Sequence, residues 1–104
     1  MKSEYRIEKW DRAEAPNGTD SRIQMESEGY RVFEWGDRAG VVYAPHEHPT
    51  DQTHCVVSGK LEITIEEYGT VVLGPGDRDF MPAGTRHSAR VVGDKPVIYL
   101  IGSK

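Results

Sequence analysis

The residues of this chain best suited to chemistry are its four histidines, three of which fall within nine residues. His46 and His48 are two positions apart, and in a β-strand such residues share a face with Cβ atoms ~6.5–7 Å apart. Both imidazoles can then reach one divalent metal at bond lengths of ~2.0–2.2 Å. Gln52 and His54 are related in the same way, and a short turn at 49–51 would place them beside the first pair. A histidine pair alone is more often solvated or hydrogen-bonded than ligating, so a metal site needs further support.

The residues around this cluster follow a recognisable spacing. Gly40 is followed by five residues, His46-x-His48, three residues, Gln52, six residues and Gly59. This pattern resembles the first motif of the cupin family, in which Glu stands at the position of Gln52.

A second spacing pattern follows in the next part of the chain. Gly76 is followed by five residues, Pro82-x-Gly84, two residues, His87, three residues and Val91. This pattern resembles the second cupin motif, in which Asn stands at the position of Val91. Two motifs in the correct order within 40–91 are far more specific than one histidine pair.

The resemblance implies a fold and a metal centre. It implies an all-β double-stranded β-helix, also called a jelly-roll barrel, with essentially no helix. It also implies that His46, His48, Gln52 and His87 meet inside the barrel around one divalent transition metal per chain: Mn, Fe, Ni or Zn. A neutral amide in place of the carboxylate leaves the metal its full charge, which favours an anionic ligand.

His54 is the candidate catalytic residue. It shares the strand parity of Gln52, so we expect its ring to face the cavity as a fourth metal ligand, a proton shuttle or a packed imidazole. Because the exchange of Glu for Gln removes a carboxylate base, His54 is the natural replacement. Cys55 has the opposite parity and is predicted to pack outside the barrel as a small hydrophobe.

The elements that must position these residues are short strands. Leu61, Ile63 and Ile65 alternate with polar residues, and Ile23 and Met25 do the same. Further β-rich runs, separated by Gly- and Pro-containing turns, occur at 30–35, 41–44, 53–57, 71–73, 90–92 and 97–101. The sole helical candidate is 7–15, and residues 77–79 are expected to lie in a turn.

The length of 104 residues predicts one cupin domain over 1–104. The segment 1–20 is expected to form an edge strand or a dimer arm, because Tyr5, Ile7 and Trp10 have no obvious place in a minimal barrel. Exposed strand edges and this segment together predict a homodimer.

Composition excludes several classes of partner. Thirteen Lys and Arg against 17 Asp and Glu give a net charge of -4 without a basic cluster, which excludes a nucleic-acid binder. Apolar runs such as 97–101 are far shorter than the ~20 residues of a membrane span. The start of the chain lacks the apolar stretch of a signal peptide, which predicts a cytoplasmic protein, and one cysteine excludes an internal disulfide.

The predicted function is that of a metal-dependent, dioxygenase-like enzyme acting on a small, anionic organic molecule. A metal-dependent lyase or isomerase that stabilises an enolate remains open, as does a non-catalytic ligand-binding or sensor protein, because fold alone does not decide function.

Overall fold

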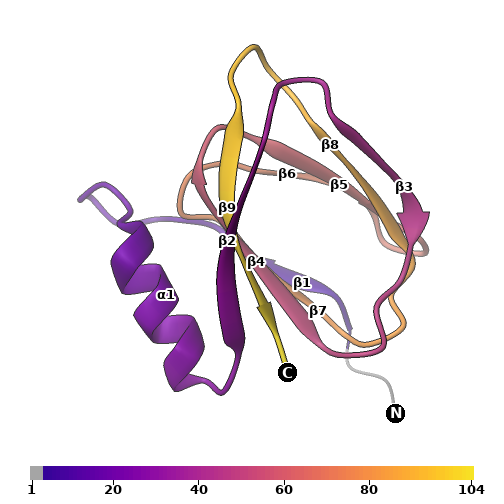
Figure 1. Ribbon diagram of the computed structural model, residues 1–104, viewed down its shortest axis with the longest axis horizontal. Coiled ribbons are helices and arrows are strands. Elements are labelled where there is room, and N and C mark those ends of the chain that lie inside the picture. The colour runs from indigo at the N-terminus through magenta and orange to yellow at the C-terminus, as the bar shows by residue number, and fades with distance from the viewer. Residues whose placement is uncertain (1–3) are drawn as a thin grey trace.

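The structure is a computed structural model that describes residues 4–104. Within them the chain forms one helix and nine strands in two antiparallel sheets (Figure 1). The elements are β1 Arg6–Glu8, α1 Gly18–Ser27, β2 Arg31–Asp37, β3 Val42–His46, β4 Gln52–Ser58, β5 Leu61–Ile65, β6 Gly69–Leu73, β7 Arg78–Met81, β8 His87–Val91 and β9 Val97–Ser103.

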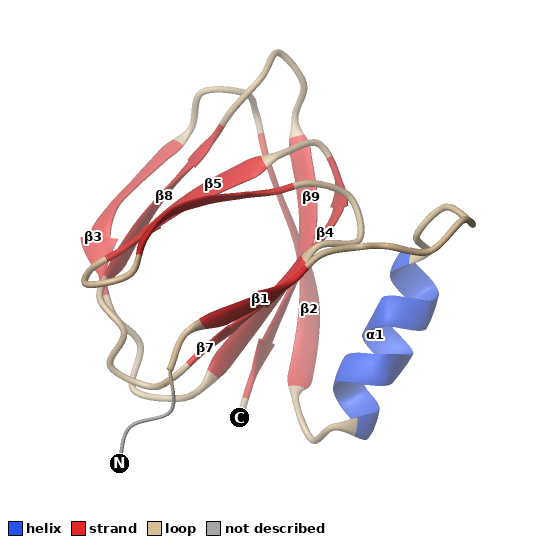
Figure 2. Ribbon diagram, turned by 180° about the vertical axis from the view of Figure 1, so that it is seen from behind, coloured by secondary structure: helices blue, strands red, loops and turns tan. Residues whose placement is uncertain are grey.

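The two sheets face each other and enclose the core. One has the strand order β1-β7-β4-β9-β2 and the other β3-β8-β5-β6 (Figures 1 and 2). Leu61, Ile63 and Ile65 of β5 are buried between the sheets, as their alternation predicts. The predicted all-β double-stranded β-helix is therefore confirmed.

The segment 22–26 was predicted to be a strand from its alternation, and this prediction is wrong, because the segment lies in α1. Asn17 caps the helix by accepting a hydrogen bond from the Asp20 N–H at 3.1 Å. Gly29 ends it with a φ of 98°, and the Tyr30 N–H donates back to the Met25 carbonyl at 3.2 Å. The two ends of the helix, rather than its side-chain pattern, determine this element.

Helix α1 lies outside the barrel, against the five-stranded sheet (Figure 2). Met25 is fully buried and packs with Cys55 and Leu100, whereas Ile23 is 60% exposed. Cys55 therefore packs outside the barrel, as its parity predicts. The alternation of Ile23 and Met25 does not mark a buried face.

The predicted helix over 7–15 is also wrong, because no helix forms there and Arg6–Glu8 is strand β1 at the edge of the five-stranded sheet. Tyr5 is buried in the core and Ile7 packs against it, so both residues have a place inside this barrel. Residues 1–3 of the predicted edge strand or dimer arm lie outside the described residues.

Residues 77–79 were expected to form a turn, but Arg78 and Asp79 belong to β7 and both are buried. The preceding turn contains Gly76 with a φ of 85°, and an added Cβ there would lie 2.7 Å from the Trp10 side chain. This position therefore requires glycine for both conformation and space.

No helix in the described part of the chain is long and apolar enough to cross a membrane.

Candidate metal centre and active-site cavity

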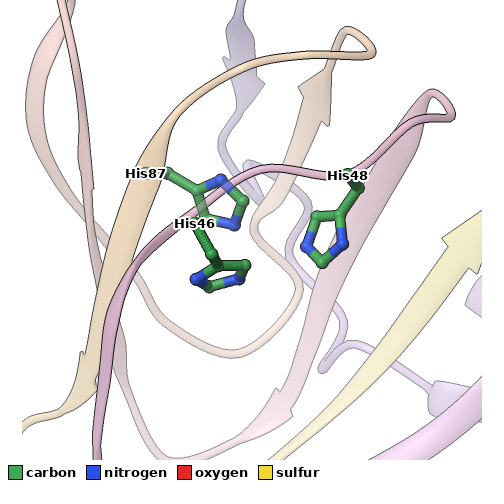
Figure 3. A group of neighbouring side chains, drawn as sticks. All are labelled: His46, His48 and His87. Carbon is green, nitrogen blue, oxygen red and sulfur yellow. The ribbon is translucent and has the colours of Figure 1, made fainter.

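Three histidines point toward one another from β3, β8 and the loop after β3 (Figure 3). His46 and His87 lie opposite each other in the β3–β8 pair, and the register of this pair shifts between Tyr43 and His46. Their ring centroids lie 4.3 Å apart, and that of His48 lies 4.9 Å from His46 and 5.2 Å from His87. One nitrogen atom from each ring lies within 4.8 Å of the others, so the three could hold one metal ion.

Backbone carbonyls fix the tautomers of two of these rings. His46 Nδ1 lies 2.7 Å from the Ala44 oxygen, and His87 Nδ1 lies 2.9 Å from the Thr85 oxygen. Because a carbonyl only accepts, each Nδ1 carries the proton and each Nε2 keeps a free lone pair. This arrangement is the one that a metal-ligating histidine commonly has.

Burial keeps two rings of this group in the neutral form that ligation needs. It lowers the pKa of His87 to about 4, with smaller contributions from the neighbouring histidines. Burial, followed by the charges of His46 and His54, also lowers the pKa of His48. The donor set therefore fits a divalent transition metal.

Two hydrogen bonds connect the His48 loop to the turn that precedes His87. The Gly84 N–H donates to the His48 carbonyl at 2.9 Å, and the Ala83 N–H donates to the Asp51 carboxylate at 2.9 Å. Asp51 thus holds the loop and does not line the cavity of the histidine cluster. These contacts bring the two sequence motifs together.

Gln52 and His54 both line the same cavity from β4, as their shared parity predicts. The His54 ring centroid lies 6.5 Å from that of His87, farther than the three clustered rings lie from one another. Gln52 lies at the start of the strand, and His54 lies deeper and is 7% exposed.

Asp79 is the residue of this region that sequence reasoning missed. Its fully buried carboxylate lies on β7 opposite His54, and its Oδ1 is 2.9 Å from His54 Nδ1. Burial disfavours the imidazolium, but the Asp79 charge and hydrogen bond together outweigh it and raise the pKa of His54. One feature of the sequence could have indicated Asp79. Residues 77–81 lie between the motif residues Gly76 and Pro82, where a strand pairs with β4.

The cavity has a volume of about 290 Å³, and aromatic side chains form part of its wall. Phe33, Trp35, Tyr43 and Tyr99 contribute to this wall. The Tyr43 hydroxyl accepts a hydrogen bond from the Trp35 indole at 3.1 Å and donates to the Asp37 carboxylate at 2.8 Å. Among the described residues, no carboxylate, ammonium or guanidinium side chain lines the cavity.

The chain matches a known protein family. A family model described as a cupin domain matches residues 34–102. The region includes both motifs and the residues of the candidate centre.

Individual relatives include a lyase. The dimethylsulfoniopropionate lyase DddQ of Ruegeria pomeroyi is 35% identical over 63 residues, which are 61% of this chain and 31% of the relative. The crystal structure of that lyase matches with a TM-score of 0.66 and 29% identity over 72% of this chain and 38% of its own. The structure of KdgF from Halomonas sp. matches with a TM-score of 0.59 and 31% identity, over 72% of this chain and 69% of KdgF. The chain thus spans well under half the length of DddQ.

Proposed function

Since this chain belongs to the cupin family, we propose that it is a metal-dependent lyase that eliminates a substituent from the β-carbon of a small carboxylate. The observation that carries the proposal is the His54 ring, which lines the same cavity as the three clustered histidines and bonds through Nδ1 to Asp79. A ring oriented in this way offers Nε2 as a base beside a candidate cation site. The similarity to a lyase supports this choice over an oxygenase.

The clustered histidines and Gln52 are the proposed metal ligands. His46 and His87 would bind the metal through Nε2 and His48 through one ring nitrogen, with the Gln52 amide oxygen as the fourth protein ligand. A divalent cation held there supplies Lewis-acid chemistry, attracting a carboxylate and making its α C–H bond more acidic. The lack of charged lining groups in the described residues means that a carboxylate meets no fixed negative charge in the cavity wall.

His54 performs the proton transfer in this proposal. Its Nε2 takes the proton from the α-carbon, and the C–H electron pair becomes the new α–β double bond. The bond between the β-carbon and its substituent breaks, and the leaving group departs with the electron pair of that broken bond. The Asp79 carboxylate stabilises the imidazolium that forms on His54.

The aromatic wall suggests the chemistry of the leaving group. Rings such as Trp35 and Tyr43 attract cations through their faces, by ~0.5–2 kcal/mol per contact. A sulfonium substituent fits such a wall and leaves as a neutral sulfide without needing a proton. Dimethylsulfoniopropionate, named as the substrate of the similar lyase, combines this cation with a carboxylate, and its elimination yields dimethyl sulfide and acrylate.

The experiment is turnover of dimethylsulfoniopropionate and other β-substituted propionates by protein loaded separately with Mn, Fe, Ni and Zn. Acrylate is measured by NMR, and oxygen consumption is measured in parallel. We expect acrylate without oxygen uptake, and a loss of roughly 10²–10⁴-fold in kcat for His54→Gln. Cys55→Ser, at the neighbouring position outside the barrel, is the control that retains activity.

Two outcomes contradict the proposal. Oxygen uptake coupled to substrate oxidation by the iron- or manganese-loaded protein would favour the dioxygenase predicted from the sequence. Stoichiometric ligand binding with no product from any substrate would favour the ligand-binding alternative.

A further inference from the structure

Asp79 is a buried carboxylate whose presence in the core needs an explanation. Its side chain is fully buried, and among residues 4–104 its one ion-pair partner is His54. Arg78, its neighbour in the chain, pairs with Glu28 instead. Burying a carboxylate without a permanent cation is costly, and an apolar residue in a β-strand would avoid that cost.

The three hydrogen bonds of this carboxylate define what it does. Oδ1 accepts from the His54 backbone N–H at 2.8 Å and faces His54 Nδ1 at 2.9 Å. One oxygen atom therefore fixes both the main chain and the ring of the same residue. Because a carboxylate only accepts, the neutral ring carries its proton on Nδ1 and leaves the Nε2 lone pair free.

Tyr5 fixes the other carboxylate oxygen. Its hydroxyl donates to Oδ2 at 2.9 Å across 74 positions of sequence, and the side chain is 7% exposed. The Tyr5 ring also meets Tyr68 edge to face at a centroid distance of 5.0 Å. Burial, and then the Asp79 charge, raise the pKa of Tyr5, so the hydroxyl remains a donor. The carboxylate consequently has no freedom to rotate away from His54.

We propose that Asp79 is a positioning residue, anchored by Tyr5, that holds His54 in the Nδ1-protonated tautomer with Nε2 directed to the cavity. The tautomer part stands on hydrogen-bond geometry alone, whereas its effect on turnover rests on the proposed function. Asp79 itself touches no substrate and acts through His54.

The first test is the tautomer of His54, read from the ¹⁵N chemical shifts of the zinc-loaded protein at a pH where the ring is neutral. His54→Gln assigns the signals. The wild type is expected to show a protonated Nδ1 and an unprotonated Nε2. Asp79→Leu removes the acceptor and keeps the branched shape of the side chain, so the Nε2-protonated form is expected to become the major one.

The second test uses Asp79→Asn, which keeps the shape and removes the charge. The Asn amide oxygen can still accept both His54 hydrogens, while its NH2 group donates to a rotated Tyr5 hydroxyl. We expect the tautomer to be kept, kcat to fall roughly 10²-fold, and KM and metal content to stay within about twofold. Tyr5→Phe should lower kcat less, by roughly 3- to 10-fold.

Asp77→Asn is the matched control, because Asp77 is a nearby carboxylate that accepts from the Trp10 and Gly74 backbone N–H groups and lies outside the cavity lining. It should leave both the His54 tautomer and kcat unchanged. A wild-type ring protonated on Nε2, or a folded Asp79→Leu variant that keeps the wild-type tautomer, would overturn the positioning role. An unchanged kcat in folded Asp79→Asn would overturn the effect of the Asp79 charge on turnover. If Asp79→Leu does not fold, the wild-type tautomer and Asp79→Asn still decide.

Failure of the proposed function gives a different result. The tautomer is then as described in the wild type and changes in Asp79→Leu, but no variant and no wild-type preparation releases acrylate. That result keeps the positioning role of Asp79 and removes the lyase.

Discussion

Three imidazoles and one amide bring no negative charge to the proposed metal centre. The metal would keep its full double charge, because no protein carboxylate neutralises part of it. An anion bound in the cavity would then stabilise this charge. In the proposed function this anion is the substrate carboxylate. The identity of residue 52 therefore connects metal affinity to substrate affinity.

Changing Gln52 to Glu adds a carboxylate of nearly the same shape. We expect Gln52→Glu to tighten metal binding roughly 10-fold, because of charge attraction, and to weaken binding of an anionic substrate. Gln52→Ala should loosen the metal only mildly, since three imidazoles remain. Parallel metal titrations with His54→Ala provide the comparison. A large loss in His54→Ala with little change in either Gln52 variant would make His54 the fourth ligand.

Removing one histidine should remove the metal. His48→Ala is expected to lose stoichiometric binding, because two imidazoles and an amide leave too few strong donors. Elemental analysis before and after chelation and reloading measures this. A wild-type protein that binds no transition metal under any loading condition would contradict it.

At the scale of elements, α1 and β7 show where local patterns mislead. The period of two at Ile23 and Met25 predicted a strand, but Asn17 and Gly29 were the decisive signals, because they satisfy the two ends of a helix. Strand β7 does not alternate between buried and exposed residues, since Arg78 and Asp79 are both buried. Arg78 pairs with Glu28 on one side of the sheet, and Asp79 pairs with His54 on the other. Neither partner can be identified until the fold brings it close.

Met25 is the main anchor of α1. Met25→Ala should lower the free energy of unfolding by about 2–5 kcal/mol, because it leaves a cavity beside Cys55 and Leu100. Ile23→Ala, on the same helix at an exposed position, should change it by less than about 0.5 kcal/mol. Urea denaturation followed by circular dichroism measures both. Equal losses would show that α1 does not pack as described.

Glu28 connects the end of α1 to β7 through Arg78, with a hydrogen bond of 2.7 Å. The hydrogen bond from Arg78 lowers the pKa of Glu28, although partial burial opposes it. This stabilisation is complete above the ordinary pKa of 4.5 and is lost as the pH falls through the lower folded-state value. The stability gap between wild type and Glu28→Gln should thus be constant from pH 7 to 5 and shrink toward pH 3. A gap independent of pH would be the contrary finding.

For the whole molecule, the two motifs were sufficient to predict the barrel, the convergence of three histidines and the inward parity of Gln52 and His54. Glycine and proline spacing made this possible, because these residues fix turns that a sequence pattern reveals directly. Asp79 and Tyr5 could not be predicted, since their contact joins residues 74 positions apart without any repeated spacing. Long-range polar contacts depend on the completed fold.

A homodimer remains a prediction, and the strand edges now provide its main argument. Strand β2 is an edge of the five-stranded sheet, and Phe33 and Trp35 on it are each 47% exposed. Pairing through this edge would cover both. Light scattering at micromolar concentration should give twice 11.7 kDa, and Phe33→Asp should halve that mass without changing the circular dichroism spectrum. A single 11.7 kDa species for the wild type would contradict the dimer.

The contact between Tyr5 and Asp79 has a consequence for how the chain acquires its chemistry during folding. Contacts between distant residues form late, because a long loop must close before they contribute. His46 and His87 can meet once β3 pairs with β8, but the Asp79 carboxylate is fixed on both sides only after β1 has docked on β7. A refolding chain would therefore regain its compactness and its cluster of histidines before its oriented base. The last step of folding would also be the step that makes the molecule chemically competent.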